Sequence, residues 1–528
     1  MLSRTPTARF VCRSCTHRFE TRAQLQQSLR RRWQSTASTT TSRTLAGDND
    51  VYDVVCVGGG PAGLSLLTAL RANPVTAGLR LALIEAQDLG RTRSYAPTPD
   101  NFANRCSSLT PASARFLDRI GAWPHLHRDR VQGYQSMQVW DGVTGARIGF
   151  DWPPGMELPD TGSTIAYMVE NNNLTAGLLR RLEELGGVDV FDGTRVDSIS
   201  FGSDGSADAG SAGDKPGLDL SQWPAVQLQG KDGSSANKKT LLARLLVGAD
   251  GANSPVRSFA DIEARGWDYE RHGVVATVLL EEGAGSLSGD AYKVAYQRFL
   301  PTGPVALLPL PGRFATLVWS TTPERAALLK SLSPEDFVAM VNAAFRLRPV
   351  DLSYMHSLSG GGQRDEVAWR LQNETATFSD PEYRAPSTIT GVQSGSVASF
   401  PLKLRHADTY IGERVALVGD AAHTVHPLAG QGLNQGQGDV ESLARTIAYA
   451  VQHGQDLGVR TSLEPYPQER YAANHLLMGV CDKLHKLYAV ESGPLVPLRS
   501  LGLRAIDAMR PLKNLLMTQA ASSGRSNA

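Results

Sequence analysis

The feature that most constrains the fold is a glycine-rich turn placed between an apolar strand and a helix. Residues 51–57 form a short, β-rich apolar run, which is typical of a buried parallel strand. This run enters the sequence GGGPAG at residues 58–63, and residues 64–70 continue with helical spacing. A G-x-G-x-x-G turn in this context is the fingerprint of a dinucleotide-binding unit. The sequence therefore predicts an α/β fold with a Rossmann-like nucleotide site.

Each glycine of this turn has a separate expected task. Gly58 permits the tight turn, Gly60 lets a pyrophosphate approach the backbone, and Gly63 lets the helix pack closely on the strand. A second strand, residues 81–84, ends at Glu85, whose carboxylate is placed to accept both ribose hydroxyls of an adenosine. The alternative is a glycine-rich turn that binds no ligand.

Two distant segments favour FAD over NAD as the dinucleotide. One is a strand that enters the turn Asp250-Gly251, and the other is a strand that ends in Gly419-Asp420 and continues into a glycine-rich run at residues 424–434. Together with the first turn, these segments resemble the flavoprotein aromatic hydroxylases, which are class A monooxygenases with the para-hydroxybenzoate hydroxylase fold. The resemblance implies an FAD-binding Rossmann-like domain, an antiparallel β-sheet substrate domain and C-terminal helices.

The resemblance also implies how the cofactor is held. The first turn would hold the ADP half of FAD, the Asp-Gly turn would lie beside the pyrophosphate, and Asp420 would bind the ribityl chain. The run from Pro427 to Asn434 would lie against the isoalloxazine ring. Arg105 would reach the flavin or its phosphates, with a surface salt bridge as the alternative. The expected cofactor-binding residues are Gly58, Gly60, Gly63, Glu85, Arg105, Asp250, Gly251, Gly419, Asp420, Pro427, Gly430, Gly432, Leu433 and Asn434.

The contact with the isoalloxazine ring also has a physical basis. Reduced flavin carries negative charge over N1 and the C2 carbonyl, and free backbone N–H groups at the start of a helix can receive it. Gly432, Leu433 and Asn434 precede a helical pattern over residues 439–451, so their N–H groups are suited to this task. No catalytic side chain is expected, because the cofactor carries the chemistry.

Three segments, residues 104–109, 423–434 and 497–503, resemble the ubiquinone-biosynthesis branch of this family. That resemblance implies hydroxylation of a polyprenylated 4-hydroxybenzoate at C5 with O₂, through a flavin C4a-hydroperoxide. It also implies electrons from ferredoxin and ferredoxin reductase, and contact with other ubiquinone-synthesis proteins. Two alternatives stay open. One is an NAD(P)H-dependent hydroxylase of a soluble phenol, and the other is a non-catalytic FAD-binding subunit of a ubiquinone-synthesis complex.

The first 43 residues form a strongly basic leader. They hold nine arginines, no lysine and one acid, Glu20, whereas the whole chain has a net charge of only +1. The remainder is therefore acidic, which argues against nucleic-acid binding, because that depends on many cations meeting phosphates. The Arg- and Ser-rich leader predicts a mitochondrial transit peptide, with a disordered basic arm as the alternative.

No metal site is expected. Cys12 and Cys15 lack a second ligand pair, and the spacing of His423 and His426 lacks an acidic third ligand. The two histidines are expected to pack or to form hydrogen bonds. The five cysteines are scattered along the chain, which indicates a reducing compartment rather than a disulfide framework.

The C-terminal stretch, residues 498–517, combines apolar and basic residues with one acid, Asp507. A helix of this kind can lie on an anionic membrane surface, here the matrix side of the mitochondrial inner membrane, or it can pack on the core. No stretch reaches the roughly 18 apolar residues that a spanning helix needs.

The remaining patterns divide the body into alternating cofactor and substrate segments. An antiparallel sheet is predicted from four apolar runs that alternate with turn signals, residues 274–280, 292–299, 305–310 and 314–320. The expected order is a transit peptide (1–43), a first FAD-binding segment (44–125), a substrate-domain segment (126–164), a second FAD-binding segment (165–265) with a flexible insertion (202–239), the substrate sheet (266–400), a third FAD-binding segment (401–460), C-terminal helices (461–517) and a disordered tail (518–528).

Overall fold

The computed structural model describes residues 49–152, 162–202, 220–229, 239–281, 293–358, 361–373, 386–426, 430–509 and 513. The predicted leader and tail lie outside these ranges, as do Pro427 and most of the predicted flexible insertion.

An eight-stranded sheet carries the glycine-rich turn. The order of its main path is β18-β19-β11-β1-β2-β8, and β10 joins β11 to β9. β1 pairs with β2, β2 with β8, and β11 with β19, all in parallel. The buried apolar run at residues 51–57 predicted a parallel strand for β1. Its strands are β1 (Asn49–Val57), β2 (Leu81–Glu85), β8 (Val188–Asp192), β9 (Arg195–Phe201), β10 (Pro224–Gln229), β11 (Thr240–Gly248), β18 (Ile411–Gly412) and β19 (Val415–Leu417).

Strand β10 lies inside the segment that was expected to be a flexible insertion. It pairs antiparallel with both β9 and β11, and Val226 is fully buried. The alternation of its apolar residues extends over only six positions, between stretches rich in glycine, serine and aspartate. The sequence signal for this strand is therefore too short to separate it from its surroundings.

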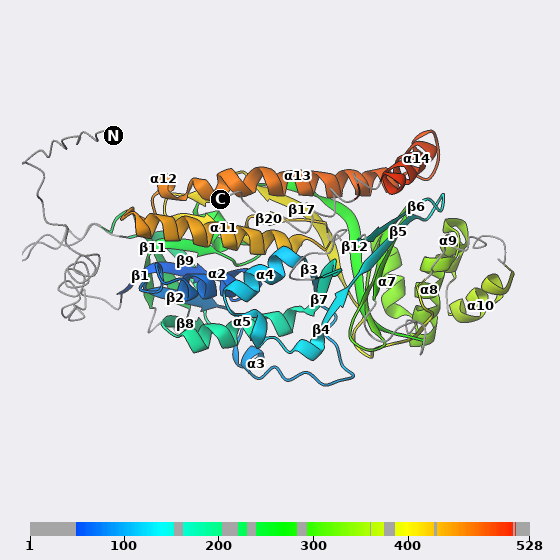
Figure 1. Cartoon of the computed structure of the whole chain (residues 1–528), viewed down its shortest axis with the longest axis horizontal. Helices are drawn as coiled ribbons and strands as arrows, with labels where there is room; N and C mark the ends of the chain where they lie inside the picture. Colours follow the sequence, from blue (N-terminus) through cyan, green and yellow to red (C-terminus); the bar gives the residue numbers. More distant parts are fainter. Residues whose placement is uncertain are drawn as a thin grey trace, which may run out of the picture. The chain divides into compact units, whose positions relative to one another are not determined.

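Helices cover the eight-stranded sheet and bury its apolar side chains. α2 (Pro61–Ala72) packs against both α5 (Asn171–Leu185) and α11 (Gly432–Gln452), so segments far apart in sequence lie side by side (Figure 1). α11 begins at Gly432, seven residues before the predicted helical pattern, so residues 432–434 form its first turn. The other helices near this sheet are α3 (Gly90–Arg93), α4 (Pro111–Arg119), α6 (Pro255–Phe259), α12 (Arg460–Leu463), η1 (Trp123–His125), η2 (Arg128–Arg130) and η6 (Gly419–Ala421).

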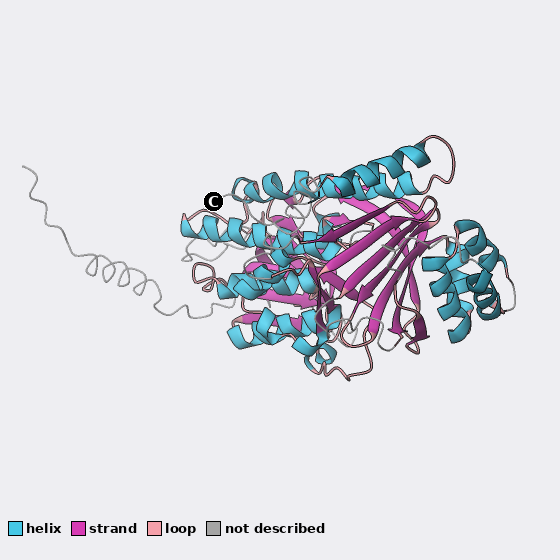
Figure 2. Ribbon diagram, turned by 45° about the vertical axis from the view of Figure 1, so that its right-hand side comes forward, coloured by secondary structure: helices cyan, strands magenta, loops and turns pink. Residues whose placement is uncertain are grey.

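A second, nine-stranded sheet lies apart from the eight-stranded one (Figure 2). Its main path is β20-β17-β12-β15-β14-β13-β5-β6, and β16 pairs with β12. The run β12-β15-β14-β13 is antiparallel, and this confirms the sheet predicted from the four apolar runs. The strands are β5 (Ser136–Asp141), β6 (Arg147–Asp151), β12 (Ala264–Leu280), β13 (Val294–Leu300), β14 (Gly303–Pro309), β15 (Phe314–Thr321), β16 (Ile389–Val392), β17 (Ala398–Ala407) and β20 (His423–Thr424).

Two details of this sheet differ from the expectation. β5 pairs with β13 in parallel, so the sheet is mixed rather than purely antiparallel. The boundary expected at residue 400 falls inside β17, which continues to Ala407 and pairs there with β12. Apolar patterning identifies strands, but it does not specify the direction in which distant strands pair.

A three-stranded sheet lies between the eight-stranded and the nine-stranded sheets (Figure 1). Its order is β3-β7-β4, from strands β3 (Cys106–Leu109), β7 (Ala166–Glu170) and β4 (Val131–Tyr134). Its apolar side chains pack against those of the nine-stranded sheet in one cluster. The buried members of this cluster are Phe102, Tyr134, Ala166, Met168, Ala295, Leu310 and Phe314.

The remaining helices extend from the sheets at two places. Four helices pack together beside the nine-stranded sheet, namely α7 (Pro323–Ser331), α8 (Pro334–Arg346), α9 (Pro349–Ser357) and α10 (Gln363–Asn373). α13 (Pro465–Tyr488) runs beside α11, and α14 (Leu495–Ala508) packs on β6 (Figure 1). Among the described residues, no helix is both long and apolar enough to cross a membrane.

Candidate functional site

The turn after β1 lies in close backbone contact with the turn after β11. Gly58 has φ +109° and donates its N–H to the carbonyl of Ile84 at 2.8 Å. A Cβ atom on Gly58 would lie 2.2 Å from the carbonyl oxygen of Ala249. Only glycine fits, because the position combines a left-handed backbone with a contact too close for any side chain.

The other two glycines of the turn differ in their surroundings. A Cβ on Gly63 would lie 1.9 Å from the carbonyl oxygen of Gly58, so close helix–strand packing requires glycine there. A Cβ on Gly60 would meet no atom within 4 Å. Gly60 is the residue that precedes the first turn of α2, where free N–H groups and the helix dipole favour an anion.

Glu85 lies at the carboxyl end of β2, directly beside this turn. Its Oε2 accepts a hydrogen bond from the N–H of Gly59, and its Oε1 accepts one from the N–H of Gln87 at 2.7 Å. The structure thus places the predicted ribose-binding carboxylate beside the glycine-rich turn, where two backbone N–H groups orient it.

Asp250 and Gly251 form the turn after β11. Oδ2 of Asp250 accepts from the N–H of Val256 at 3.3 Å, whereas Oδ1 is buried and has no hydrogen-bond partner among the described residues. Burial raises the pKa of Asp250, partly offset by hydrogen bonds to this carboxylate. Gly251 has φ +84°, and a Cβ there would meet nothing within 4 Å. An unsatisfied carboxylate oxygen beside an open glycine turn is suited to a hydroxyl-bearing ligand such as a dinucleotide.

The Gly419-Asp420 turn meets the first turn at the start of α2. Gly419 has φ +60°, and a Cβ there would lie 3.4 Å from the Cβ of Ala62. The Asp420 side chain reaches solvent, yet the surrounding protein raises its pKa by desolvation, while His423 opposes the shift. The structure therefore brings the three predicted glycine-rich turns together, although the first and the last are far apart in the chain.

The first turn of α11 is fixed by the side chain of Asn434. Oδ1 of Asn434 accepts from the N–H of Thr110 at 2.9 Å and from the hydroxyl of Ser113 at 2.8 Å, and Nδ2 donates to the carbonyl of Ser108 at 2.7 Å. The sequence pointed to the backbone N–H of Asn434. Its buried side chain, which ties α11 to β3 and α4, was not foreseen.

Gly430 lies close to the same segment. It has φ +60°, and a Cβ there would lie 3.7 Å from the Cβ of Ser108. The Ser108 hydroxyl is 2.9 Å from the phenol oxygen of Tyr134, which belongs to the apolar cluster between the sheets. The predicted isoalloxazine-binding run therefore borders an apolar wall with two hydroxyl groups. Pro427 of that run lies outside the described residues.

Arg105 is exposed and is not joined to the other predicted residues. Its guanidinium forms no hydrogen bond or ion pair with any residue in the described ranges. The loop before it is anchored by a buried ion pair that no sequence pattern indicated. Arg130 contacts Glu170 through two hydrogen bonds of 2.8 and 2.9 Å, and Glu170 also accepts from the N–H of Ala103.

Histidine residues near the site lie in packed surroundings. His423 is fully buried and pairs with Asp439, and the rings of His426 and His485 pack with Tyr269. Among the described residues, no group of three or more His, Cys, Asp or Glu side chains could hold a metal ion. Cys12 and Cys15 lie outside those residues.

Comparison with known families and folds agrees with this geometry. Residues 51–375 and 384–478 match the FAD binding domain family. The fold is similar to that of p-nitrophenol 4-monooxygenase from Pseudomonas putida, with a TM-score of 0.62, 20% identity, and coverage of 91% of this chain and 100% of that chain. It is also similar to that of a probable FAD-dependent monooxygenase from Pseudomonas aeruginosa, with a TM-score of 0.58 and 20% identity over 86% of this chain and 100% of that chain. The chain therefore belongs to the FAD binding domain family and has the fold of the aromatic hydroxylases.

Curated relatives narrow the class further. The chain is 40% identical to the mitochondrial ubiquinone biosynthesis monooxygenase COQ6 of Schizosaccharomyces pombe, over 89% of this chain and 92% of that protein. It is 37% identical to the human protein of the same name, over 90% of this chain and 94% of that protein. The chain belongs to the COQ6 family of ubiquinone biosynthesis monooxygenases.

Proposed function

We propose that this protein hydroxylates a polyprenylated 4-hydroxybenzoate at C5 of the ring during ubiquinone biosynthesis. When bound, FAD supplies the oxygen-transfer chemistry with O₂. The chain itself binds and orients the cofactor, holds the phenol ring against it and excludes water. The observation that carries the proposal is the apolar wall beside Gly430, taken with membership of the COQ6 family.

The cluster between the two sheets suits a phenol that bears a hydrocarbon tail. Its apolar side chains can bury the ring and the start of the tail, and each buried CH₂ contributes about 0.8 kcal/mol. Tyr134 and Ser108 provide hydroxyl groups at the edge of the cluster. Burial raises the pKa of Tyr134, with an opposing effect from Ser108, so its phenol stays protonated and can hydrogen-bond a ring substituent.

The cofactor contacts follow from the convergence of the three turns. We assign the pyrophosphate to the open space at Gly60 and Gly251, and the unsatisfied oxygen of Asp250 to a nearby hydroxyl group. Asp420 binds the ribityl chain, and Glu85 binds the adenosine ribose. The N–H groups of residues 432–434 would stabilise negative charge on a bound flavin, and Arg105, as a free cation, would approach its phosphates or its ring.

The proposed location is the matrix side of the inner membrane, and the exposed face of helix α14 supports contact with a membrane surface. Leu498 and Leu501 project outward with 62% and 66% of their surface exposed, and Arg504 beside them is exposed as well. An exposed apolar face with a neighbouring cation suits the surface of an anionic membrane. We further propose that residues 1–43 direct the protein to mitochondria and that other ubiquinone-synthesis proteins are partners at that surface.

The test is an assay of purified residues 44–528 with a prenylated 4-hydroxybenzoate and two electron donors in parallel. One donor is NADPH alone, and the other is NADPH with ferredoxin and ferredoxin reductase. Hydroxylation only with the ferredoxin pair is the expected result. Turnover of a soluble phenol with NADPH alone would contradict the proposed donor and substrate and favour an NAD(P)H-dependent hydroxylase of a soluble phenol. Bound FAD without product under either donor would favour a non-catalytic subunit.

A further inference from the structure

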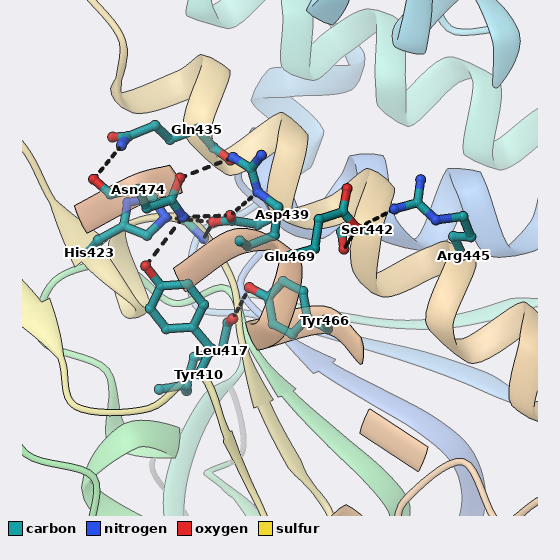
Figure 3. Close-up of polar contacts among 12 residues, drawn as sticks. Tyr410, Leu417, His423, Gln435, Asp439, Ser442, Arg445, Tyr466, Glu469 and Asn474 are labelled. Carbon is teal, nitrogen blue, oxygen red and sulfur yellow. Dashed lines mark hydrogen bonds and ion pairs between the residues drawn. The ribbon is translucent and has the colours of Figure 1, made fainter. Parts of the chain in front are cut away.

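A single buried carboxylate holds both ends of the turn that contains Asp420. Asp439 lies on α11 and is fully buried. Its Oδ2 accepts a hydrogen bond from the N–H of Gly419 at 3.2 Å. The same oxygen lies 2.5 Å from Nε2 of His423, and Figure 3 shows these two side chains together. Gly419 immediately precedes Asp420, and His423 lies three residues after Asp420. A single oxygen atom of Asp439 therefore contacts the turn on both sides of Asp420.

The other oxygen of Asp439 is fixed by helix α13. Oδ1 accepts from Nε of Arg470 at 3.1 Å. It also accepts from Nδ2 of Asn474 at 2.9 Å (Figure 3). Nδ2 of Asn474 also lies 3.2 Å from the phenol oxygen of Tyr410. The carboxylate therefore has four partners, two from the turn itself and two from α13.

The charge of Asp439 is stable in this environment. Burial alone would raise its pKa, but the charges and hydrogen bonds of His423, Arg470 and Asn474 outweigh that effect and leave the pKa lowered. Asp439 is therefore ionised at physiological pH. A buried, ionised carboxylate with all its partners in place holds a rigid geometry, whereas losing it leaves several donors unsatisfied.

We propose that Asp439 is a positioning residue for FAD, which sets the orientation of Asp420 by bracketing the Gly419–His423 turn. The inference rests on the role of Asp420 proposed above. It extends that role to α13, because Arg470 and Asn474 fix Asp439. The C-terminal helical region then contributes to cofactor binding through contacts behind the site.

The test compares Asp439→Asn with Asp420→Asn and with the double variant, by titration of FAD-depleted full-length protein with FAD. Asparagine matches aspartate in size but has only one acceptor oxygen, so it cannot serve all four partners. We expect each single variant to raise the dissociation constant for FAD about tenfold or more, as loss of a supporting contact behind a ligand does. The double variant should bind FAD only slightly more weakly than either single variant, because Asp439 acts on FAD through the carboxylate of Asp420.

Glu469→Gln is the matched control. Glu469 also links α13 to α11, through the hydroxyl of Ser442 at 2.6 Å and through Arg445, but it does not contact the Gly419 turn. FAD affinity should stay within about twofold of the parent in this variant. Losses that multiply in the double variant, or an equal loss in Glu469→Gln, would show a general structural role and overturn the inference.

Two further outcomes separate the inference from the proposed site. If Asp439→Asn binds FAD normally while Asp420→Asn does not, only the positioning role of Asp439 fails. If Asp420→Asn binds FAD normally, the ribityl contact fails and the positioning role fails with it.

Should Asp439→Asn not fold, His423→Gln and His423→Leu take its place. Glutamine retains a hydrogen-bond donor for Asp439, so the His423→Gln variant should bind FAD more tightly than the His423→Leu variant. Equal FAD affinities of the two variants would overturn the inference.

Discussion

Arg499 and Asp141 form a buried two-point ion pair between α14 and the end of β5. Nε and one terminal nitrogen of Arg499 lie 2.9 and 3.1 Å from the two carboxylate oxygens, and both side chains are almost fully buried. Arg499 also donates to the carbonyls of Leu487 and Val490. The contact fixes the inner face of α14 and leaves its apolar outer face exposed.

Replacing Arg499 should destabilise the protein strongly. Arg499→Met leaves Asp141 buried without its partner, which costs about 3–5 kcal/mol in such pairs. Chemical denaturation measures the change in the free energy of unfolding. Arg504→Met on the exposed face of the same helix serves as the control and should change stability by less than about 0.5 kcal/mol. Equal losses in the two variants would contradict the anchoring role.

Gly60→Ala should separate cofactor binding from folding. The protein has room for a methyl group at this position and the backbone φ is −75°, so the apoprotein should unfold as the parent does. The methyl group would occupy the space assigned to the pyrophosphate, and FAD affinity should fall about tenfold or more. Gly78→Ala, which also has open space, should change neither property. Normal FAD binding by Gly60→Ala would contradict the assignment of the pyrophosphate to this turn.

Asn434→Ala should loosen the start of α11. The variant removes hydrogen bonds to Ser108, Thr110 and Ser113 and leaves buried groups unsatisfied, so stability should fall by about 2–4 kcal/mol. FAD affinity should fall too, because the N–H groups of the first turn lose their fixed position. Denaturation and FAD titration report the two effects. The exposed Asn172→Ala is the control, and a purely local role would leave FAD affinity intact.

Buried histidines should make the protein less stable in mild acid. Burial lowers the pKa of His356 from an ordinary value of 6.5 to about 3, with Arg325 adding to the shift. Burial also lowers the pKa of His406 to about 4, and neighbouring histidines add to that shift while neighbouring carboxylates oppose it. Between about pH 4 and 6.5 these two histidines therefore bind more protons in the unfolded chain than in the folded one. The free energy of unfolding should fall as pH decreases through this window, as denaturation at several pH values would show.

His356→Leu tests the origin of that pH dependence. Both ring nitrogens of His356 are buried and have no hydrogen-bond partner among the described residues, and the ring lies beside Trp319. Leucine should therefore preserve or raise stability at about pH 7.5 and reduce the slope between about pH 4 and 6.5. An unchanged slope would assign the effect to other groups.

The features of the site that could be predicted from sequence are those fixed by local backbone geometry. Gly58 and Gly419 have positive φ and lie in turns directly after strands, so the requirement for glycine is visible in the sequence itself. Residues with a side-chain role across the fold were not visible. The pairs Arg130–Glu170 and Arg499–Asp141 depend on how distant elements pack, and the sequence shows no special pattern at these charged residues.

The fold shows the same division. Parallel strands around the first turn and the antiparallel run β12-β15-β14-β13 follow from apolar patterning. The parallel pairing of β5 with β13 does not, because a one-dimensional pattern carries no information about which distant edges meet. His423 is a similar case: packing or hydrogen bonding was expected, but its partner Asp439 is set by the position of α11.

Insertion of an oxygen atom from O₂ into a prenylated phenol is the activity on which the proposed function depends. The most direct measurement is turnover under ¹⁸O₂ with the ferredoxin pair as donor, followed by mass spectrometry and NMR of the product. We predict one ¹⁸O atom per product molecule, located at C5 of the ring. Product that carries oxygen from water, or FAD-loaded protein that forms no product under these conditions, would contradict the proposed function.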